Sequence, residues 1–504
     1  MKDLNIINPS NQQLNNLLKC YQTGRYIDAE KLSLSITKEF PEHPFAWKVL
    51  GIVFKKTGRI NEALVVNQKS VELEPINMEA NFNLGNTLQE LGRLEEAEAC
   101  YKQAISIKPD YAEAHNNLGV TLQKIGRLEE AEACYKQAIS IKPDYAEAHN
   151  NLGVTLQKIG RLEEAEACYK QAISIKPDYA EAHNNLGVTL QKIGRLEEAM
   201  NTFIKIIKLN PNLPKSYIKL VELLTIYDPQ EEVLHPIVKI AQEIKDTNLK
   251  DKTLDVISSN KVIKIISKSS NIIKRYNIRL QTDLSQVYRR NSIDLNCKRH
   301  KAIFNKFNII PKFCFGCYKV QVEPRSVIEL IKLLIVFDQI KLDKNNTRKC
   351  MIEMRQEVSG FYKGLIYCTG LEEAYQIANY LEKVVEEKIS SELSVMIKRG
   401  CSEYTISFPD YKEINKFGPQ RMSYDEDWKS IEKNHDSLNP IKSNKIIPTF
   451  SGINLHDILI VQNWIDYAKG IGDTSLNLLG QTKVFSPKIF KIAKKRIEKY
   501  PWQR

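Results

Sequence analysis

Apolar residues in the N-terminal half recur three and four positions apart, which is the spacing of one face of an α-helix. One segment places Leu118 and Leu122 on such a face, and the next segment places Leu128, Ala131 and Tyr135 on another. A glycine separates the two segments and a proline ends the second. Glycine permits the tight turn after a helix, and proline cannot continue one. The pattern therefore predicts pairs of short helices.

The helix pairs repeat every 34 residues. The turn glycines are Gly24, Gly58, Gly92, Gly126, Gly160 and Gly194, and the prolines are Pro41, Pro75, Pro109, Pro143, Pro177 and Pro211. The segment Gly92–Ala165 recurs unchanged as Gly126–Ala199. A period of this length predicts an α-solenoid, in which each unit packs only against its neighbours.

The repeat resembles the tetratricopeptide repeat (TPR) family. Its signature residues are Trp47, Leu50, Gly51, Ala63 and Pro75 in one unit, and Leu84, Gly85, Ala97, Tyr101, Ala104 and Pro109 in the next. The first unit departs from the pattern, since Asn16 and Leu17 stand where Leu and Gly are expected. The resemblance implies six units and a cap helix over residues 11–226, forming a right-handed superhelix whose concave groove binds extended peptide segments of other proteins.

The first helix of each unit would line that groove. Its candidate peptide-binding residues are Asn83, Asn116, Asn117, Asn150, Asn151, Asn184, Asn185, Lys124 and Lys158. A primary amide both donates and accepts hydrogen bonds, so a regular row can pair with a peptide backbone whatever its side chains. The row is similar to the asparagine ladder in the repeats of protein O-linked N-acetylglucosamine transferases. The alternative is that these amides bond to neighbouring helix ends or only solvate a surface.

Histidines recur in the same helices at the position that Trp47 holds in an earlier unit. They are His115, His149 and His183. The repeat spacing holds them too far apart to share one metal ion. We expect each ring to pack against its neighbours.

The C-terminal half has a different pattern. The predicted elements are a strand at 318–323, a helix at 325–339, strands at 350–354 and 364–368, a helix at 371–388, and strands at 395–398 and 404–408. Up to the strand at 395–398 the order is β-α-β-β-α-β, which predicts an α+β domain with a ferredoxin-like arrangement. The predicted divisions are a helical connector at 227–295, this domain at 296–410, and a helical extension at 411–504.

Four metal-ligand residues stand beside the first of these strands. Two residues separate Cys297 from His300, and two residues likewise separate Cys314 from Cys317. Two such chelating pairs suit a tetrahedral Cys3His site, and zinc prefers these ligands. The alternative is that the cysteines are small core residues and that the spacing is a coincidence. The predicted cofactor is therefore one structural zinc ion at most.

Two further candidate sites lie in the same region. Tyr318 and Tyr367 resemble, in part, the stacking aromatics of an RNA-recognition motif, although Leu365 stands where that family expects an aromatic residue. Cys401 follows basic residues that would lower a thiol pKa, and only His435 and His456 are candidate partners for it. A buried structural thiol is the alternative for Cys401.

Charge and composition add three expectations. Residues 1–214 carry a net charge of −2 and residues 215–504 carry +14, which together give +12, so the basic half would meet an acidic partner or nucleic acid. The longest apolar run, 328–337, contains Glu329 and Lys332 and is too short to span a membrane. The N-terminus lacks the pattern of a signal peptide, which predicts a cytoplasmic location and reduced cysteines.

The sequence therefore predicts a protein-interaction scaffold that binds extended segments in its groove and makes a second contact through its basic C-terminal domain. No phosphate-binding loop, dinucleotide fingerprint, zinc-protease motif or nucleophile elbow occurs. Enzymatic activity is accordingly not favoured. The alternatives left open are a protein-modifying transferase whose repeats recruit substrate, and RNA binding by the C-terminal domain.

Overall fold

The computed structural model describes residues 8–211, 214–230, 233–248, 256–278, 280–289, 295–356, 358–401, 403–417, 419–438, 449–479 and 484–500. Its contacts divide the chain into two compact units, Met1–Arg195 and Leu196–Arg504.

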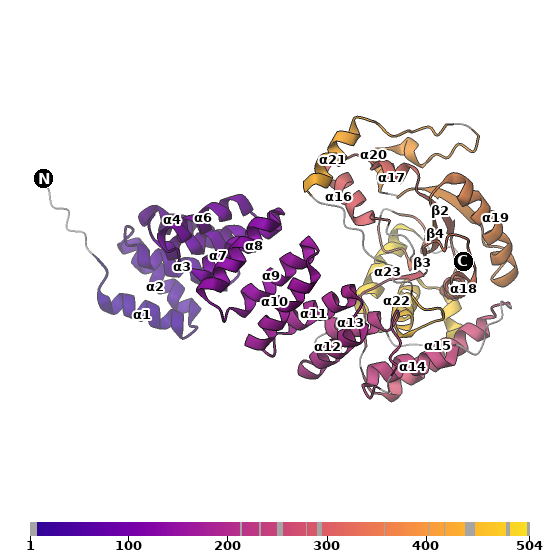
Figure 1. The fold of residues 1–504 in the computed structure, drawn as a ribbon, viewed down its shortest axis with the longest axis horizontal. Coiled ribbons are helices and arrows are strands. Elements are labelled where there is room, and N and C mark those ends of the chain that lie inside the picture. The colour runs from indigo at the N-terminus through magenta and orange to yellow at the C-terminus, as the bar shows by residue number, and fades with distance from the viewer. Residues whose placement is uncertain are drawn as a thin grey trace. The chain divides into compact units, whose positions relative to one another are not determined.

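The first unit is a series of packed helix pairs (Figure 1). Its helices are α1 (Asn11–Gln22), α2 (Tyr26–Glu39), α3 (Pro44–Lys56), α4 (Ile60–Leu73), α5 (Met78–Glu90), α6 (Leu94–Ile107), α7 (Ala112–Ile125), α8 (Leu128–Ile141), α9 (Ala146–Ile159), α10 (Leu162–Ile175) and α11 (Ala180–Ile193). Helices α1, α3, α5, α7 and α9 each begin a repeat and pack against the even-numbered helix that follows. This arrangement confirms the predicted α-solenoid.

Glycine has two distinct tasks in each repeat. Gly126 ends α7 with a φ of 98°, a left-handed conformation that favours glycine. Gly119, inside α7, instead permits close helix packing. A Cβ atom there would lie 2.7 Å from Cε1 of Tyr135 on α8, well inside van der Waals contact.

The first helices of successive repeats lie closer together than the second helices. α3 contacts α5, α5 contacts α7, α7 contacts α9, and α9 contacts α11. Within the described ranges, the backbones of α4, α6, α8 and α10 do not approach one another in a comparable way. The first helices therefore occupy the inner side of the curved solenoid.

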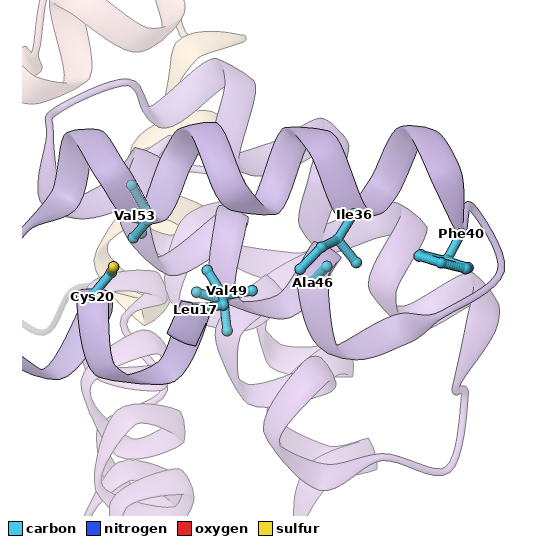
Figure 2. Close-up of a cluster of buried hydrophobic side chains, with 8 residues drawn as sticks. Leu17, Cys20, Ile36, Phe40, Ala46, Val49 and Val53 are labelled. Atoms are coloured by element: carbon cyan, nitrogen blue, oxygen red, sulfur yellow. The ribbon is translucent and has the colours of Figure 1, made fainter. Parts of the chain in front are cut away.

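The apolar core of the first repeats contains the residue that departs from the repeat pattern. Leu17 is fully buried in a cluster with Cys20, Ile36, Val49 and Val53 (Figure 2). The leucine that replaces the expected small residue therefore fills a core position in α1.

The second unit combines helices with one sheet. Its helices are α12 (Leu196–Leu209), α13 (Pro214–Leu223), α14 (Pro236–Asn248), α15 (Ser259–Arg275), α16 (Cys297–Phe307), α17 (Lys312–Phe315), α18 (Val327–Gln339), α19 (Leu371–Lys388), α20 (Tyr404–Ser407), α21 (Trp428–Leu438), α22 (Leu455–Ile471) and α23 (Pro487–Lys499), with 3-10 helices η1 (Pro409–Lys412) and η2 (Thr474–Leu479). Its strands are β1 (Gln286–Arg289), β2 (Tyr318–Val322), β3 (Arg348–Ile352), β4 (Tyr362–Cys368) and β5 (Val395–Arg399).

The sheet has the order β1-β3-β4-β2-β5, and every neighbouring pair is antiparallel. The elements β2, α18, β3, β4, α19 and β5 follow one another as predicted, which confirms an α+β arrangement in this half of the chain. Two predictions differ. Strand β1 comes from the region predicted as a helical connector. The segment predicted as a strand at 404–408 forms helix α20, because Tyr404 packs on Phe304 and Tyr411 instead of pairing with the sheet.

The two faces of the sheet differ in character. Gly364 of β4 lies directly against Leu333 of α18, and helices α18 and α19 cover this apolar face. Side chains alternate along a strand, so the neighbours of these core residues point to the opposite face. On that face Lys319 of β2 stands opposite Tyr367 of β4 and Lys398 of β5.

Helix α22 forms much of the core of the second unit. Trp464 and Tyr467, which the sequence places together on a packed face, are fully buried. Trp464 Nε1 donates to the Ser285 carbonyl at 2.9 Å, and the Tyr467 hydroxyl donates to the Glu353 carbonyl at 2.6 Å. Among the helices described, none combines the length and apolar character that crossing a membrane needs.

Candidate functional site

The predicted amide row runs along the first helices, and part of its hydrogen-bonding capacity joins one repeat to the next. Three bonds recur at successive junctions: Asn117 Nδ2 to Asn86 Oδ1 at 2.8 Å, Asn151 Nδ2 to Asn116 Oδ1 at 3.1 Å, and Asn185 Nδ2 to Asn150 Oδ1 at 3.0 Å. Asn116 and Asn150 are buried, so they act mainly inside the solenoid. The alternative interpretation of the row, bonding between neighbouring helices, thus accounts for part of it.

The remaining capacity of the row is concentrated on half-buried amides. Asn151 and Asn185 each use one N–H in the junction, and no other described residue accepts from their amides or donates to their Oδ1 atoms. Asn117 differs, because its amide also bonds to the Tyr101 hydroxyl and its Oδ1 accepts from Asn116 at 3.1 Å. Asn151 and Asn185 can therefore still bond to a peptide backbone.

The other predicted groove residues have mixed surroundings. Asn83 is half-buried, and its backbone carbonyl oxygen accepts from Thr87 Oγ1 at 3.0 Å. Asn184 Nδ2 donates to the Ala180 carbonyl at 3.0 Å, within its own helix. Lys124 and Lys158 are exposed near the ends of α7 and α9.

A second series of bonds links the same helices. Glutamine amides donate to threonine hydroxyls one repeat later: Gln89 to Thr121 at 2.7 Å, Gln123 to Thr155 at 2.6 Å, and Gln157 to Thr189 at 2.8 Å. On the second helices, arginines pair with glutamates of the preceding repeat: Arg127 with Glu98 at 2.7 Å, Arg161 with Glu132 at 2.8 Å, and Arg195 with Glu166 at 2.7 Å. Each junction is therefore fixed by polar bonds on both sides.

The recurring histidines have a structural task. Nε2 of His115, His149 and His183 lies 2.9, 3.0 and 2.9 Å from the carbonyl oxygen of the proline six residues earlier. Trp47 Nε1 donates to Pro41 in the same way at 2.8 Å. Asn81, at this position of the unit between them, donates from Nδ2 to the Pro75 carbonyl at 3.0 Å. The position therefore requires a side-chain N–H that reaches the preceding turn.

The four predicted zinc ligands lie around one cavity of about 210 Å³ in the second unit. They do not support a metal site. Among the described residues, no group of three or more His, Cys, Asp or Glu side chains is placed to hold a metal ion. Cys314 Sγ lies 3.4 Å from the Tyr404 hydroxyl, and the His300 ring stacks on Phe313 with centroids 5.1 Å apart. Burial raises the pKa of Cys314 to about 12 and that of Cys317 to about 11, so both thiols keep their protons at neutral pH.

The two tyrosines considered as RNA-stacking residues lie on opposite faces of the sheet. Tyr318 stands opposite Cys368 on the helix-covered face, whereas Tyr367 lies on the other face and lines the cavity. Cys401 also lines the cavity, and Lys319 Nζ lies 3.3 Å from its Sγ. The candidate partners of Cys401 lie elsewhere, since His435 packs edge-on against Phe307 and His456 lines a different cavity.

Sequence reasoning missed the basic character of this cavity. Lys319, Lys349, Lys363 and Lys398 come from four strands and all line it. The available signal was the alternation of Lys319 and Gln321 along β2, and of Lys363, Leu365 and Tyr367 along β4. Alternation of this kind indicates a second face that is not part of an apolar core.

Comparison with known proteins identifies the N-terminal repeats. Residues 110–178 and 144–211 match the tetratricopeptide repeat family, residues 85–126 match a TPR repeat, and residues 67–99 match a further tetratricopeptide repeat. No curated protein matches the chain, so the likeness to the repeats of O-linked N-acetylglucosamine transferases is unsupported.

Several solved structures are similar to part of the chain. MamA is 26% identical, with 32% of this chain and 95% of MamA covered and a TM-score of 0.31. TTC0263, a thermophilic TPR protein from Thermus thermophilus, is 25% identical, with 35% and 95% covered and a TM-score of 0.31. YrrB, described as a TPR protein with an unusual peptide-binding site, is 21% identical, with 37% and 95% covered and a TM-score of 0.32. Residues 67–211 of this chain therefore consist of repeats of the tetratricopeptide repeat family.

Proposed function

We propose that the repeats bind an extended segment of another protein along the face formed by α5, α7, α9 and α11. The tetratricopeptide match supports a protein-interaction scaffold. The finer proposal depends on one observation: among the described residues, Asn151 and Asn185 each have an N–H with no partner beyond the bond that joins the repeats.

The spacing of these amides suits an extended backbone. The first helices of successive repeats contact one another, and packed helices lie about 8–10 Å apart. An extended chain rises about 3.3 Å per residue, so successive amides would meet every third peptide group. Because the contacts are to the backbone, this face would tolerate many side-chain sequences in the partner.

Two features favour a partner segment with acidic residues. Lys124 and Lys158 are exposed at equivalent positions of α7 and α9. The surrounding helices partly desolvate the ammonium groups of Lys158 and of Lys192 one repeat later, although both side chains reach solvent. This desolvation lowers their pKa, and a nearby carboxylate would offset its cost. We propose that the second unit, which carries most of the positive charge, supplies a second contact to the same partner.

We also propose that β2, β3, β4 and β5 form a ferredoxin-like unit to which β1 adds an edge strand. The supporting observation is the order β3-β4-β2-β5, in which β2 and β4, the strands that directly precede α18 and α19, lie in the middle of the four. The function of this unit in partner binding does not depend on that assignment.

The test is binding of the full-length protein to a peptide array and to reduced, carboxymethylated α-lactalbumin, a chain that stays extended. The double variant Asn151→Ala, Asn185→Ala should weaken binding about tenfold or more, since each amide loses its bond to the ligand. Arg127→Ala is the matched control, because it also removes a junction bond, to Glu98, but on the second helices. Unchanged binding by the amide variant, or equal loss in both variants, would contradict the groove.

A further inference from the structure

The cavity on the polar face of the sheet is enclosed from two sides. Its floor consists of alternate residues of the five strands, and its opposite wall comes from α16, α17 and α20. The volume of about 210 Å³ suits a small molecule and not a long polymer. All its described lining residues belong to the second unit.

The lining of this cavity carries an excess of positive charge. Six basic side chains line it, against one carboxylate, Glu403. A second carboxylate, Glu353, lies close by and pairs with Arg355 at 2.8 Å and with Lys363 at 3.1 Å. The negative charge of these two carboxylates does not neutralise the six basic side chains.

Three of the cations lie along β2, β3 and β5. Lys319 is buried, and its ammonium donates to the Gly400 carbonyl at 2.8 Å and contacts a sulfur, so neither partner is a carboxylate. Lys349 makes no ion pair with a described residue, and its ammonium lies 5.5 Å from the Tyr288 ring centroid. Lys398, on the strand beside Lys319, lines the same space.

Keeping these lysines charged inside the cavity costs free energy unless an anion is bound. Burial, reinforced by Lys319 and Arg355, lowers the pKa of Lys349 to about 8. Burial also lowers the pKa of Lys398, with Lys363 and Lys319 adding to the effect. An anion in the cavity would stabilise the charged forms, because opposite charge offsets the cost of burial.

The remaining lining determines which anion fits. Leu365, Met351 and the ring of Tyr367 form an apolar patch beside the lysines. A phosphate group offers up to two negative charges and several acceptor oxygens, which suits three ammonium groups better than one carboxylate does. The apolar patch would contact the carbon skeleton that bears the phosphate.

We propose that this cavity binds a small phosphorylated compound, with its phosphate at Lys319, Lys349 and Lys398 and its carbon skeleton on Leu365 and Tyr367. The site is independent of the groove on the repeats. Helices α16 and α17 place Cys297, His300 and Cys314 over the sheet face, which leaves room for a compact ligand between helices and strands.

The test is isothermal titration calorimetry on the full-length protein. The probes are glycerol phosphate, ribose phosphate and adenosine monophosphate, each paired with its phosphate-free counterpart. At least one phosphorylated probe should bind, and its counterpart should not. Lys349→Gln should weaken that binding about tenfold or more, because one charge-assisted bond is lost. This substitution leaves no described carboxylate without its partner.

Lys433→Gln is the matched control, since Lys433 is exposed on α21 and does not line the cavity. It should bind as the parent protein does. A second variant, Lys398→Gln, should show the same loss of binding. It serves as the test if Lys349→Gln melts at a lower temperature than the parent. No binding of any phosphorylated probe, or equal binding by both cavity variants and the parent, would overturn the proposal. Binding of polyuridine without binding of the small probes would overturn it in favour of RNA.

Discussion

Replacing Gly119 with alanine tests how closely the helices of one repeat must approach. The added Cβ would lie 2.7, 2.9 and 3.0 Å from three ring carbons of Tyr135, whereas carbon atoms in contact prefer about 3.5–4.0 Å. Tyr135 is fully buried, so its ring has little room to move. Overpacking of this kind costs about 1–3 kcal/mol. Alanine regains about 1 kcal/mol of helix propensity, which leaves a net loss of up to about 2 kcal/mol.

The assay is hydrogen exchange of the full-length protein, followed in peptides from α7 and α8. Gly119→Ala should lower the free energy of local opening there, because a solenoid unit depends on its nearest neighbours. Adding Tyr135→Ala should remove the effect of Gly119→Ala, since the overlapping ring is gone. Gly126→Ala is the control: no atom lies within 4 Å of its Cβ, so its cost comes from the positive φ and should persist in the Tyr135→Ala background. Unchanged exchange in Gly119→Ala, or an equal effect with and without the ring, would refute the packing argument.

Three further predictions concern charges. Arg127→Met should lower the thermal unfolding temperature only slightly, because Arg127 is 37% exposed, and the difference should shrink in high salt. Arg289→Met should cost about 3–5 kcal/mol in urea unfolding, since two buried carboxylates lose their shared cation; a loss below 1 kcal/mol, about a surface effect, would contradict this. The lowered pKa of Lys349 means that its charge destabilises the fold fully below about pH 8, and that this penalty disappears as pH rises to 10.5. Lys349→Gln should therefore be more stable than the parent at neutral pH, by at most about 3 kcal/mol, and equal to it above pH 10.5.

The sequence predicts the repeats well because their structure depends on short-range pattern. The spacing of Leu118 and Leu122, the turn at Gly126 and the close approach at Gly119 all act within one 34-residue unit. Nothing distant is needed to form α7 and α8. The position shared by Trp47 and His115 is equally local, since each ring bonds to a carbonyl six residues earlier.

The cavity depends on long-range pairing, which one sequence does not contain. Lys319 and Lys398 are far apart in the chain and become neighbours only when β2 pairs with β5. The register also decides that Tyr318 and Tyr367 face opposite sides, which their spacing in the sequence does not indicate. Around Tyr404 the alternation of Tyr404, Ile406 and Phe408 resembles a strand, but packing against Phe304 stabilises a helical turn instead.

The uniform junctions make the length of this solenoid adjustable. An arginine–glutamate pair and a glutamine–threonine bond recur at consecutive boundaries with nearly the same distances. Inserting or deleting one whole copy between Gly126 and Gly160 would bring together two surfaces that already meet elsewhere in the molecule. Duplication or loss of a copy in the gene would thus change the length of the solenoid without requiring any new interface to evolve.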